Sequence, residues 1–485
     1  MANPLLIAYV VGWVLLIAGL GLLLPLIPAA VYGEPLSWYV KSWVISLCAG
    51  SVLVALGLRS RRRSQEMRSR DSLAVVAIAW FLLSLFGALP YWFSGRLDVW
   101  GAIFESFSGL SSTGATNIND LSGYPKGLLF WRSLTQYVGG LGIIVLMVAV
   151  LPFLGVGGQL LMKNELSSGV SNEKLKPRVA QIAKILWMVY LAFTVGFFLL
   201  YYLGGQGVLD SVCLTFTTLS TGGFSNWNDS MGHYSGSYLP VLSIVVMFLG
   251  SVSFALHYQL LTGNIRALFG NPEVLFFGGV ILASTIVIGL TLFLTGTYQS
   301  VYKSFYYAVF HATSIASTTG HALTDWSKWP NLAVGVMFLL FFVGGCSGST
   351  SGGLKCMRWL ILIKSIHRNF RRYIHPRGVF PVRINGKPIP EPVLEGVWLF
   401  FLLYFVIFAI SSVLLTAMGL NVFDSISATA SAMGNVGPAL GNLGPASTYW
   451  WIPGPAKAVL SLDMLLGRLE LYSVLIIFVP EFWSK

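Results

Sequence analysis

The segment Leu219-Ser220-Thr221-Gly222-Gly223-Phe224 is one of four short polar segments, each with a glycine, that interrupt an otherwise apolar chain. The four segments align on Gly114, Gly222, Gly320 and Gly434, so the glycines are 108, 98 and 114 residues apart (222 − 114, 320 − 222, 434 − 320). A nearly regular period of this kind is typical of a duplicated structural unit. The sequence therefore predicts four versions of one unit.

The composition indicates that a bilayer surrounds most of this chain. Hydrophobic residues make up 55% and charged residues 10% of its 485 positions, whereas an average soluble domain carries about 25% charged residues. A helix needs about 20 apolar residues to cross the hydrocarbon core of a membrane. The candidate spanning runs are 4–31, 38–58, 72–94, 127–152, 180–204, 237–262, 273–296, 331–363, 394–419 and 455–480.

A shorter stretch leads into each glycine segment, near 99–112, 207–220, 301–318 and 422–433. A short helix that ends in a polar loop within apolar surroundings is typical of a re-entrant hairpin. The predicted unit is therefore a spanning helix, a pore helix with its loop, and a second spanning helix.

The predicted fold is an all-α polytopic membrane protein in which four such pseudo-repeats surround one central pore. An additional helix pair precedes them. The predicted boundaries are 1–71 for the N-terminal helix pair and its basic loop, 72–152, 180–262 and 273–364 for pore repeats 1 to 3, and 394–485 for pore repeat 4.

Basic residues are concentrated in three connections, within 59–70, 163–178 and 355–387, and the formal net charge is +12. In a soluble protein this excess would suggest a nucleic-acid partner. Here the positive-inside rule explains it, and it places all three connections and both termini in the cytoplasm. The alternative is that these connections contact the membrane surface or a soluble partner. The first apolar run lacks a basic n-region and a cleavage site, so we expect a retained helix rather than a signal peptide.

The four loops suit a dehydrated monovalent cation. Backbone carbonyls can replace the water around such an ion without a fixed charge that would trap it, glycine permits the dihedral angles that aim them, and hydroxyl groups add further oxygen atoms. The C-terminal ends of the pore helices, which carry a partial negative charge, also favour a cation. The candidate ion-binding residues are Ser112, Thr113, Gly114, Ser220, Thr221, Gly222, Thr318, Thr319, Gly320, Gly434, Asn435 and Val436.

Other polar residues in these regions receive simpler interpretations. We interpret Glu105, Asp210 and Asp424 as acids at the starts of pore helices rather than as ion ligands. The four cysteines form no Cys-x-x-Cys pair and have no histidine cluster beside them, so we expect packing roles and neither a metal centre nor a disulfide.

The run 331–363 contains ten residues, 344–353, of which five are glycine. The apolar flanks are too short to span separately, so the helix must break inside the membrane, where broken backbone has to line water or protein. We predict a gate from Gly344, Gly345, Ser347, Gly348, Ser349, Thr350, Ser351, Gly352 and Gly353. A static kink is the alternative. A phosphate-binding loop is rejected because Leu354 occupies the lysine position.

Arg468 lies about 20 Å into the last apolar run, near the middle of the membrane. A buried arginine is costly and normally faces a cavity or a partner. Asp463 and Glu470 lie on other faces of the same helix. Arg468 therefore pairs with another helix or faces the pore, where it would be an electrostatic barrier and part of the gate.

These segments together resemble the Trk/Ktr/HKT superfamily of K⁺ transporters. The resemblance rests on residues 219–224 (LSTGGF), 344–353 (GGCSGSTSGG) and 464–470 (MLLGRLE), covers essentially the whole chain, and with the N-terminal helix pair favours the bacterial TrkH/TrkG branch. It implies a homodimer in a bacterial inner membrane, a cytoplasmic nucleotide-binding partner, TrkA, and preference for K⁺ and Rb⁺ over Na⁺. No nucleotide site or other cofactor is expected in this chain. His321 and Met433 depart from a uniform loop pattern, so the filter is expected to be short and asymmetric.

The function expected from the sequence is K⁺ uptake through a channel-like pore gated from the cytoplasm. The first alternative is a carrier that couples K⁺ to Na⁺ or H⁺, because broken helices also occur in such proteins. The second is a membrane enzyme, which we do not favour because His257, His311 and His321 are scattered and no catalytic spacing accompanies them.

Overall fold

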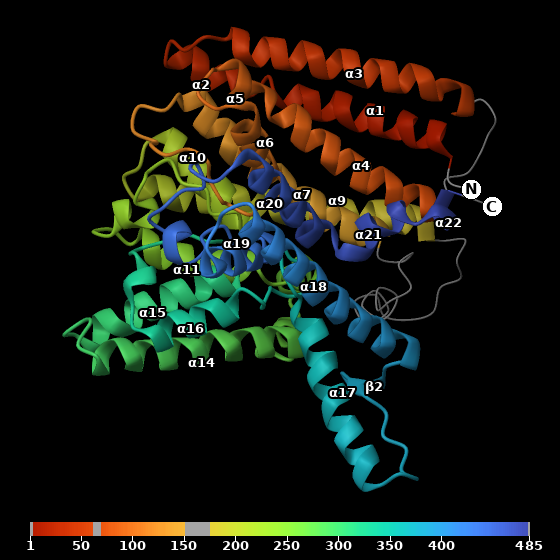
Figure 1. The fold of residues 1–485 in the computed structure, drawn as a ribbon, viewed down its shortest axis with the longest axis vertical. Helices are drawn as coiled ribbons and strands as arrows, with labels where there is room; N and C mark the ends of the chain where they lie inside the picture. Colours follow the sequence, from red (N-terminus) through yellow and green to blue (C-terminus); the bar gives the residue numbers. More distant parts are fainter. Residues whose placement is uncertain (1–2, 62–68, 151–174, 484–485) are drawn as a thin grey trace.

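The computed structural model describes residues 3–61, 69–150 and 175–483. These residues form a bundle of helices, with one small antiparallel pair of strands, β1 (Arg383–Ile384) and β2 (Lys387–Pro388). The predicted all-α polytopic fold is confirmed (Figure 1). Parts of two predicted basic connections, 62–68 and 151–174, lie outside the described residues, as do residues 1–2 and 484–485.

The N-terminal pair is formed by α1 (Pro4–Gly21), which continues into α2 (Leu26–Val31), and by α3 (Ser37–Arg61). Small residues let α1 and α3 approach closely. A Cβ atom at Gly12 would lie 2.8 Å from both the carbonyl oxygen of Gly50 and the amide nitrogen of Val54. Glycine is therefore required at this crossing by the backbone of the partner helix.

The first two repeats follow the predicted order, with additional short helices. Repeat 1 contains α4 (Ser69–Gly87), α5 (Leu89–Phe93), the pore helix α6 (Val99–Leu110) and α7 (Lys126–Val150). Repeat 2 contains α9 (Leu175–Leu203), the pore helix α10 (Val208–Leu219), the 3₁₀ helix η3 (Ser230–Tyr234), α11 (Leu239–Gly250), α12 (Phe254–Leu261) and α13 (Ile265–Phe269).

The last two repeats are more interrupted. Repeat 3 contains α14 (Pro272–Leu294), the pore helix α15 (Val301–Ala316), η4 (Trp326–Lys328), α16 (Asn331–Leu340) and α17 (Cys356–Ile374). Repeat 4 contains α18 (Glu391–Ala417), the pore helix α19 (Val422–Gly434), η5 (Gly441–Leu443), α20 (Gly454–Leu469), α21 (Leu471–Leu475), η6 (Ile476–Phe478) and α22 (Pro480–Trp483).

Six of the ten predicted spans contain, within the described residues, helices that are long and apolar enough to cross a bilayer. A seventh, 237–262, is a pair, α11 and α12, bent by 101° at Ser251–Ser253. The run 455–480 is also divided, because Glu470 takes a positive φ of 61° after α20 ends. The prediction of single helices was therefore wrong for these two runs. The predicted break in 331–363 is confirmed, and it extends over residues 341–355.

The long helices run roughly parallel, and α1 begins at the same end of the bundle at which α3 ends, α4 begins and α22 ends (Figure 1). Helix α17 leaves the bundle at a steep angle to α14, and the chain then turns back so that β1 and β2 lie beside α17, where the Lys364 side chain donates to the Arg383 carbonyl (Figure 1). Of the four cysteines, Cys213, Cys346 and Cys356 are buried and Cys48 is exposed; all four are free. The expected packing role therefore fits three of them.

The variant Gly12→Ala is expected to lower the thermal stability of the purified protein, because its Cβ atom would push α1 away from the backbone of α3. Such overpacking costs about 1–3 kcal/mol. Gly196→Ala is the control, since a Cβ atom there meets nothing within 4 Å and alanine favours a helix over glycine by about 1 kcal/mol. Equal melting temperatures for the two variants would contradict this account of the crossing.

Candidate functional site: a ring of four loops

The four pore helices end in the same local structure. The residue after each helix, or one further on, takes a left-handed conformation: Ser112, Thr221, Thr318 and Asn435, with φ between 52° and 59°. The amide of the following residue then donates to a carbonyl five residues earlier, for example Thr113 to Ser108 at 2.9 Å and Val436 to Ser431 at 2.9 Å. This is a Schellman-type ending, which pairs carbonyl groups that the end of a helix leaves free.

A glycine with positive φ follows each of these left-handed residues two positions later: Gly114, Gly223, Gly320 and Gly437, with φ between 76° and 101°. We call these four the ring glycines. In loops 2 and 4 the structurally equivalent glycines, Gly223 and Gly437, differ from the glycines on which the sequence was aligned. The alignment on Gly222 was wrong by one position, and the alignment on Gly434 by three, because Gly434 is still the last residue of α19.

The ring glycines join the four loops in a closed cycle. A Cβ atom on a ring glycine would meet the carbonyl oxygen of the residue that precedes the ring glycine of the next loop. These contacts are Gly114 with Gly222 at 2.1 Å, Gly223 with Thr319 at 1.8 Å, Gly320 with Val436 at 2.0 Å and Gly437 with Thr113 at 2.6 Å. Any side chain at these positions would separate neighbouring loops. The cycle brings together residues from all four repeats around one axis.

All twelve candidate ion-binding residues lie in or directly beside this ring and are buried, except Gly114 and Gly320, which are partly exposed. Several of their polar side chains already bond the protein. The Ser112 hydroxyl donates to the Gln136 carbonyl at 3.2 Å, and the Thr318 hydroxyl accepts the Gly352 amide at 2.8 Å. The Asn435 amide group donates to the Thr113 hydroxyl at 3.0 Å. These side chains therefore hold the loops in place.

Gln136, a residue of α7 that the sequence did not single out, reaches the second loop. Its side-chain amide donates to the Gly222 carbonyl at 2.6 Å, and its side-chain oxygen accepts the Phe224 amide at 3.1 Å. A cavity of about 120 Å³ opens above the ring and is lined by the four ring glycines and the segments that follow them. At its rim, Asn228 donates to Asp120 at 2.7 Å, which lowers the pKa of that carboxyl group.

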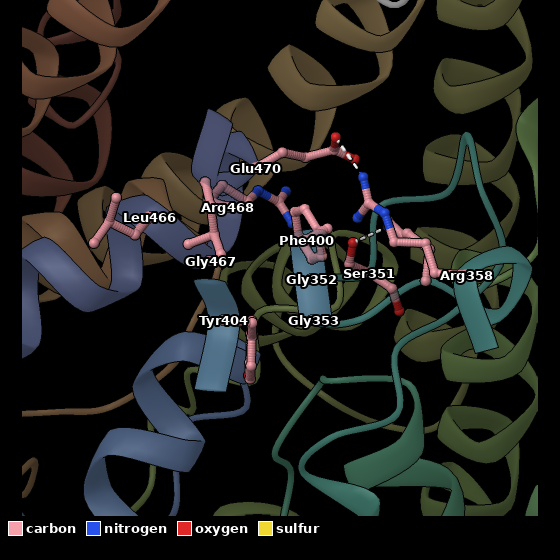
Figure 2. A pocket seen from close by; sticks show the side chains of 12 residues that line it. Ser351, Gly352, Gly353, Arg358, Phe400, Tyr404, Leu466, Gly467, Arg468 and Glu470 are labelled. Carbon is pink, nitrogen blue, oxygen red and sulfur yellow. Dashed lines mark hydrogen bonds and ion pairs between the residues drawn. The ribbon is translucent and has the colours of Figure 1, made fainter. Parts of the chain in front are cut away.

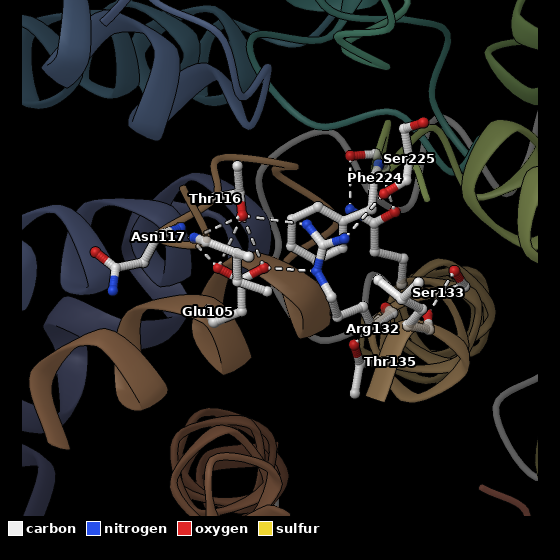
Figure 3. A network of polar contacts seen from close by, with 12 residues as sticks. Glu105, Thr116, Asn117, Arg132, Ser133, Thr135, Phe224 and Ser225 are labelled. Atoms are coloured by element: carbon white, nitrogen blue, oxygen red, sulfur yellow. Dashed lines mark hydrogen bonds and ion pairs between the residues drawn. The ribbon is translucent and has the colours of Figure 1, made fainter. Parts of the chain in front are cut away.

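A second group of residues that the sequence did not predict connects loops 1 and 2 (Figure 3). Arg132 of α7 forms a buried ion pair with Glu105 of α6 at 2.7 Å and donates to the Ser225 carbonyl at 2.9 Å. Its guanidinium group lies over the Phe224 ring, 4.1 Å from the centroid. Glu105 also accepts the Asn117 amide at 2.7 Å. Arg132 interrupts the apolar run 127–152, so the sequence did contain a signal for this site.

The acids of the pore helices therefore differ in their roles. Asp210 and Asp424 lie in the first turns of α10 and α19, as predicted. The prediction was wrong for Glu105, which lies in the second half of α6 and is fully buried. A carboxylate at that depth needs a partner, and Arg132 supplies it.

Residues 341–355, called the intramembrane loop below, lie between α16 and α17 and contact the inner face of the ring. The Thr350 hydroxyl donates to the carbonyls of Leu219, at the end of α10, at 3.0 Å and of Gly250 at 2.9 Å. A Cβ atom at Gly352 would lie 2.5 Å from that of Asn435. The loop therefore touches the second and fourth repeats, and its Gly352 amide bonds Thr318 of the third.

The bend in repeat 2 is paired with this loop. The Cys346 amide donates to the Ser251 carbonyl at 2.8 Å, and the Phe254 amide donates to the Gly348 carbonyl at 3.1 Å. Glu273, at the start of α14, accepts the Ser347 amide at 3.2 Å and the Ser347 hydroxyl at 2.8 Å. The bend in repeat 2 and the intramembrane loop thus supply hydrogen-bond partners for each other. Backbone groups that leave a helix at this depth need such partners because no water is available to them in the membrane.

Arg468, at the end of α20, is buried and bonds three parts of the site. It donates to the Thr350 carbonyl at 2.6 Å, to the Ser112 hydroxyl at 3.2 Å and to the Gly139 carbonyl at 3.0 Å. None of the ion pairs among the described residues includes Arg468. Its charge is therefore surrounded by oxygen dipoles, directly beside the first loop and the intramembrane loop.

Glu470 binds Arg358 of α17 instead, at 2.7 Å, and the Arg358 guanidinium group lies 3.8 Å from the centroid of the Phe400 ring (Figure 2). The space between this pair, Arg468 and residues 351–353 has a volume of about 10 Å³, which is about the volume of one water probe. The cavity between these residues therefore has room for about one water molecule. Among the described residues, no group of three or more His, Cys, Asp or Glu side chains could hold a metal ion.

Together, the fold and the site define a polytopic α-helical membrane protein in which four re-entrant loops surround one axial passage. The chain belongs to the TrkH family, whose model is described as a cation transport protein and matches residues 38–485. It is 34% identical over 483 residues to the Trk system potassium uptake protein TrkH of Salmonella typhimurium, with 99% of each chain covered. It is 32% identical over 483 residues to TrkG of Escherichia coli, covering 99% of this chain and 98% of that protein. The crystal structure of the potassium transporter TrkH from Vibrio parahaemolyticus superposes with a TM-score of 0.90 at 33% identity, with 99% of each chain covered.

Gly223→Ala is expected to reduce cation uptake by purified, reconstituted protein about tenfold or more, because its Cβ atom would collide with the Thr319 carbonyl and overpacking of this kind costs about 1–3 kcal/mol. Gly123→Ala is the matched control. Its φ is 71°, against 76° for Gly223, but a Cβ atom there meets nothing within 4 Å. Equal uptake by the folded Gly223→Ala and Gly123→Ala variants would contradict the conclusion that close contacts between the four loops are needed for transport.

Proposed function

We propose that this chain mediates potassium uptake across the cell membrane through a K⁺/Rb⁺-selective, channel-like pore. The main support for this proposal is the closed cycle in which each ring glycine lies against a backbone carbonyl of the next loop. An ion without its water shell needs oxygen atoms on every side, and each of the four loops brings a backbone carbonyl to the closed cycle of ring glycines. The ends of the pore helices converge on the same ring and favour a cation. The relatives named as potassium uptake proteins support K⁺ as the ion.

We further propose that the intramembrane loop and Arg468 form the gate. The loop lies against the left-handed residues of the third and fourth loops, and Arg468 joins it to the first. A fixed positive charge at this point opposes the passage of cations. Movement of residues 344–353 away from the ring, together with Arg468, would open the passage.

We also propose where the chain functions and with which partners. The protein functions as a homodimer in a bacterial inner membrane, with both termini in the cytoplasm, and a TrkA-like nucleotide-binding subunit regulates it from the cytoplasmic side. The common end of α1 and α22 is consistent with this orientation. The exposed basic residues Arg371 and Arg372 on the projecting α17 provide a surface for a cytoplasmic partner. K⁺ is the transported ion, and the chain itself needs no cofactor.

Uptake of radiolabelled Rb⁺ into K⁺-loaded liposomes that contain the purified protein tests this function. We expect uptake that external K⁺ blocks and external Na⁺ or Li⁺ blocks much less, without a gradient of a second ion, because carbonyl ligands select by ion size and field. Uptake that requires a Na⁺ or H⁺ gradient would instead establish the coupled carrier. No uptake by protein shown to be folded would contradict the proposal for the isolated chain.

Arg468→Ala is expected to increase Rb⁺ uptake, because it removes the positive charge beside the passage and the hydrogen bond to Thr350. Loss of one charge-assisted hydrogen bond of about 1.5–3 kcal/mol corresponds to a change of about 10- to 100-fold in the ratio of closed to open protein. Arg371→Ala, an exposed arginine on α17, is the control and should leave uptake in liposomes unchanged. Folded Arg468→Ala with wild-type or lower uptake would count against a role in gating.

A further inference from the structure

Each of the four loops turns back past its own pore helix after the ring glycine, and a side chain of that helix holds it there. In repeats 1 and 3 this side chain lies seven residues before the left-handed residue: Glu105 before Ser112 (112 − 105) and His311 before Thr318 (318 − 311). In repeats 2 and 4 it lies eleven residues before: Asp210 before Thr221 (221 − 210) and Asp424 before Asn435 (435 − 424).

Three of these four side chains are carboxylates, and each accepts hydrogen bonds from the returning segment. Glu105 accepts the Asn117 amide at 2.7 Å. Asp210 accepts the side-chain amide of Asn226 at 2.7 Å. Asp424 accepts the backbone amide of Asn442 at 3.0 Å and its side-chain amide at 2.8 Å. Acceptance of N–H groups from the returning segment is therefore common to the repeats.

In repeat 3 the imidazole of His311, and not a carboxylate, accepts the N–H groups of the returning segment. Its Nε2 atom accepts the backbone amides of Leu323 at 3.1 Å and Thr324 at 3.4 Å. Since a backbone amide can only donate, Nε2 must carry no proton, and the ring proton lies on Nδ1, which donates to the Tyr307 carbonyl at 2.8 Å. Both ring nitrogens are therefore assigned, and the imidazole is neutral.

The surroundings explain why a neutral acceptor occupies this place. Glu105 in repeat 1 is compensated by Arg132 at 2.7 Å. None of the ion pairs among the described residues includes His311, whose side chain is fully buried and packs against the rings of Phe310 and Trp329. A carboxylate there would be an unpaired buried charge, which is costly. Histidine supplies the acceptor without that charge.

We infer that His311 is a positioning residue that sets ion selectivity at the third loop by holding the segment after Gly320. Leu323 and Thr324 follow Gly320 by three and four residues, and Gly320 closes the cycle between loops 3 and 4 against the Val436 carbonyl. Without the acceptor, the buried amide of Leu323 and the partly buried amide of Thr324 lose their partner, and this segment moves. The ring then widens between loops 3 and 4, which admits ions with other ligand requirements. The inference rests on the proposed pore function.

The test compares Rb⁺ uptake, and its inhibition by Na⁺, in liposomes containing the full-length wild-type protein or the variants His311→Leu, His311→Asn and His311→Gln. Leucine has no acceptor. Asparagine can reach the Tyr307 carbonyl but not the returning segment, and glutamine can place an oxygen atom near the position of Nε2. We expect the preference for K⁺ over Na⁺ to fall about fivefold in the Leu and Asn variants, the factor that one lost hydrogen bond corresponds to, and to be restored in the Gln variant.

His257→Leu is the matched control. His257 is a buried histidine of α12 that bonds the Leu249 carbonyl at 2.8 Å, so its loss should leave ion preference unchanged. Wild-type selectivity in a folded His311→Leu variant would overturn the inference. So would a result in which only the Gln variant folds, because His311 would then stabilise the fold without setting selectivity. No selective uptake by the wild-type protein would instead refute the proposed function.

Discussion

The structure depends on one constraint, namely that every backbone N–H and C=O group at membrane depth must find a partner within the protein. Continuous helices meet this requirement alone, but the four pore helices end inside the bundle, and three of the second spanning helices bend or break. The Schellman-type endings pair the terminal carbonyls of the pore helices. The bend at Ser251–Ser253 and the intramembrane loop pair with each other, through the amides of Cys346 and Phe254. Non-helical chain is thus stable here because its segments occur in complementary pairs.

Buried charge follows a related rule. Arg132 and Glu105 neutralise each other at 2.7 Å and share their remaining hydrogen bonds between loops 1 and 2. Arg468 donates its hydrogen bonds to carbonyl and hydroxyl oxygens. It takes part in none of the ion pairs among the described residues. The first arrangement holds two loops together and leaves little net field at the passage. The second leaves a positive charge next to the first loop, which is why the proposed gate includes Arg468 and leaves out Arg132.

The four units share a backbone design but not the same side chains. Left-handed residues and ring glycines recur at equivalent places in all four. The side chains that hold the returning segments alternate between two positions, so repeats 1 and 3 resemble each other, as do repeats 2 and 4. The second spanning helices diverge further, from the continuous α7 to the widely separated α16 and α17. The four loops thus share a backbone conformation around one axis while the side chains that support them differ. The short, asymmetric filter expected from His321 and Met433 stays a prediction.

The sequence alone determined the membrane class, the existence of four units, the break within 331–363 and the special position of Arg468, because apolar run length, period and a charge in an apolar run are local signals. It did not determine the register of the loops: Gly222 and Gly434 were aligned by residue type, whereas the fold aligns dihedral angles, and Asn435 takes the left-handed place that a hydroxyl residue takes elsewhere. It also missed the bend at Ser251 and the partners of Glu105, Gln136 and His311. Those features depend on groups from other repeats or from the returning segments, such as the Cys346 amide that bonds the Ser251 carbonyl, and only the tertiary structure brings such groups within hydrogen-bonding distance.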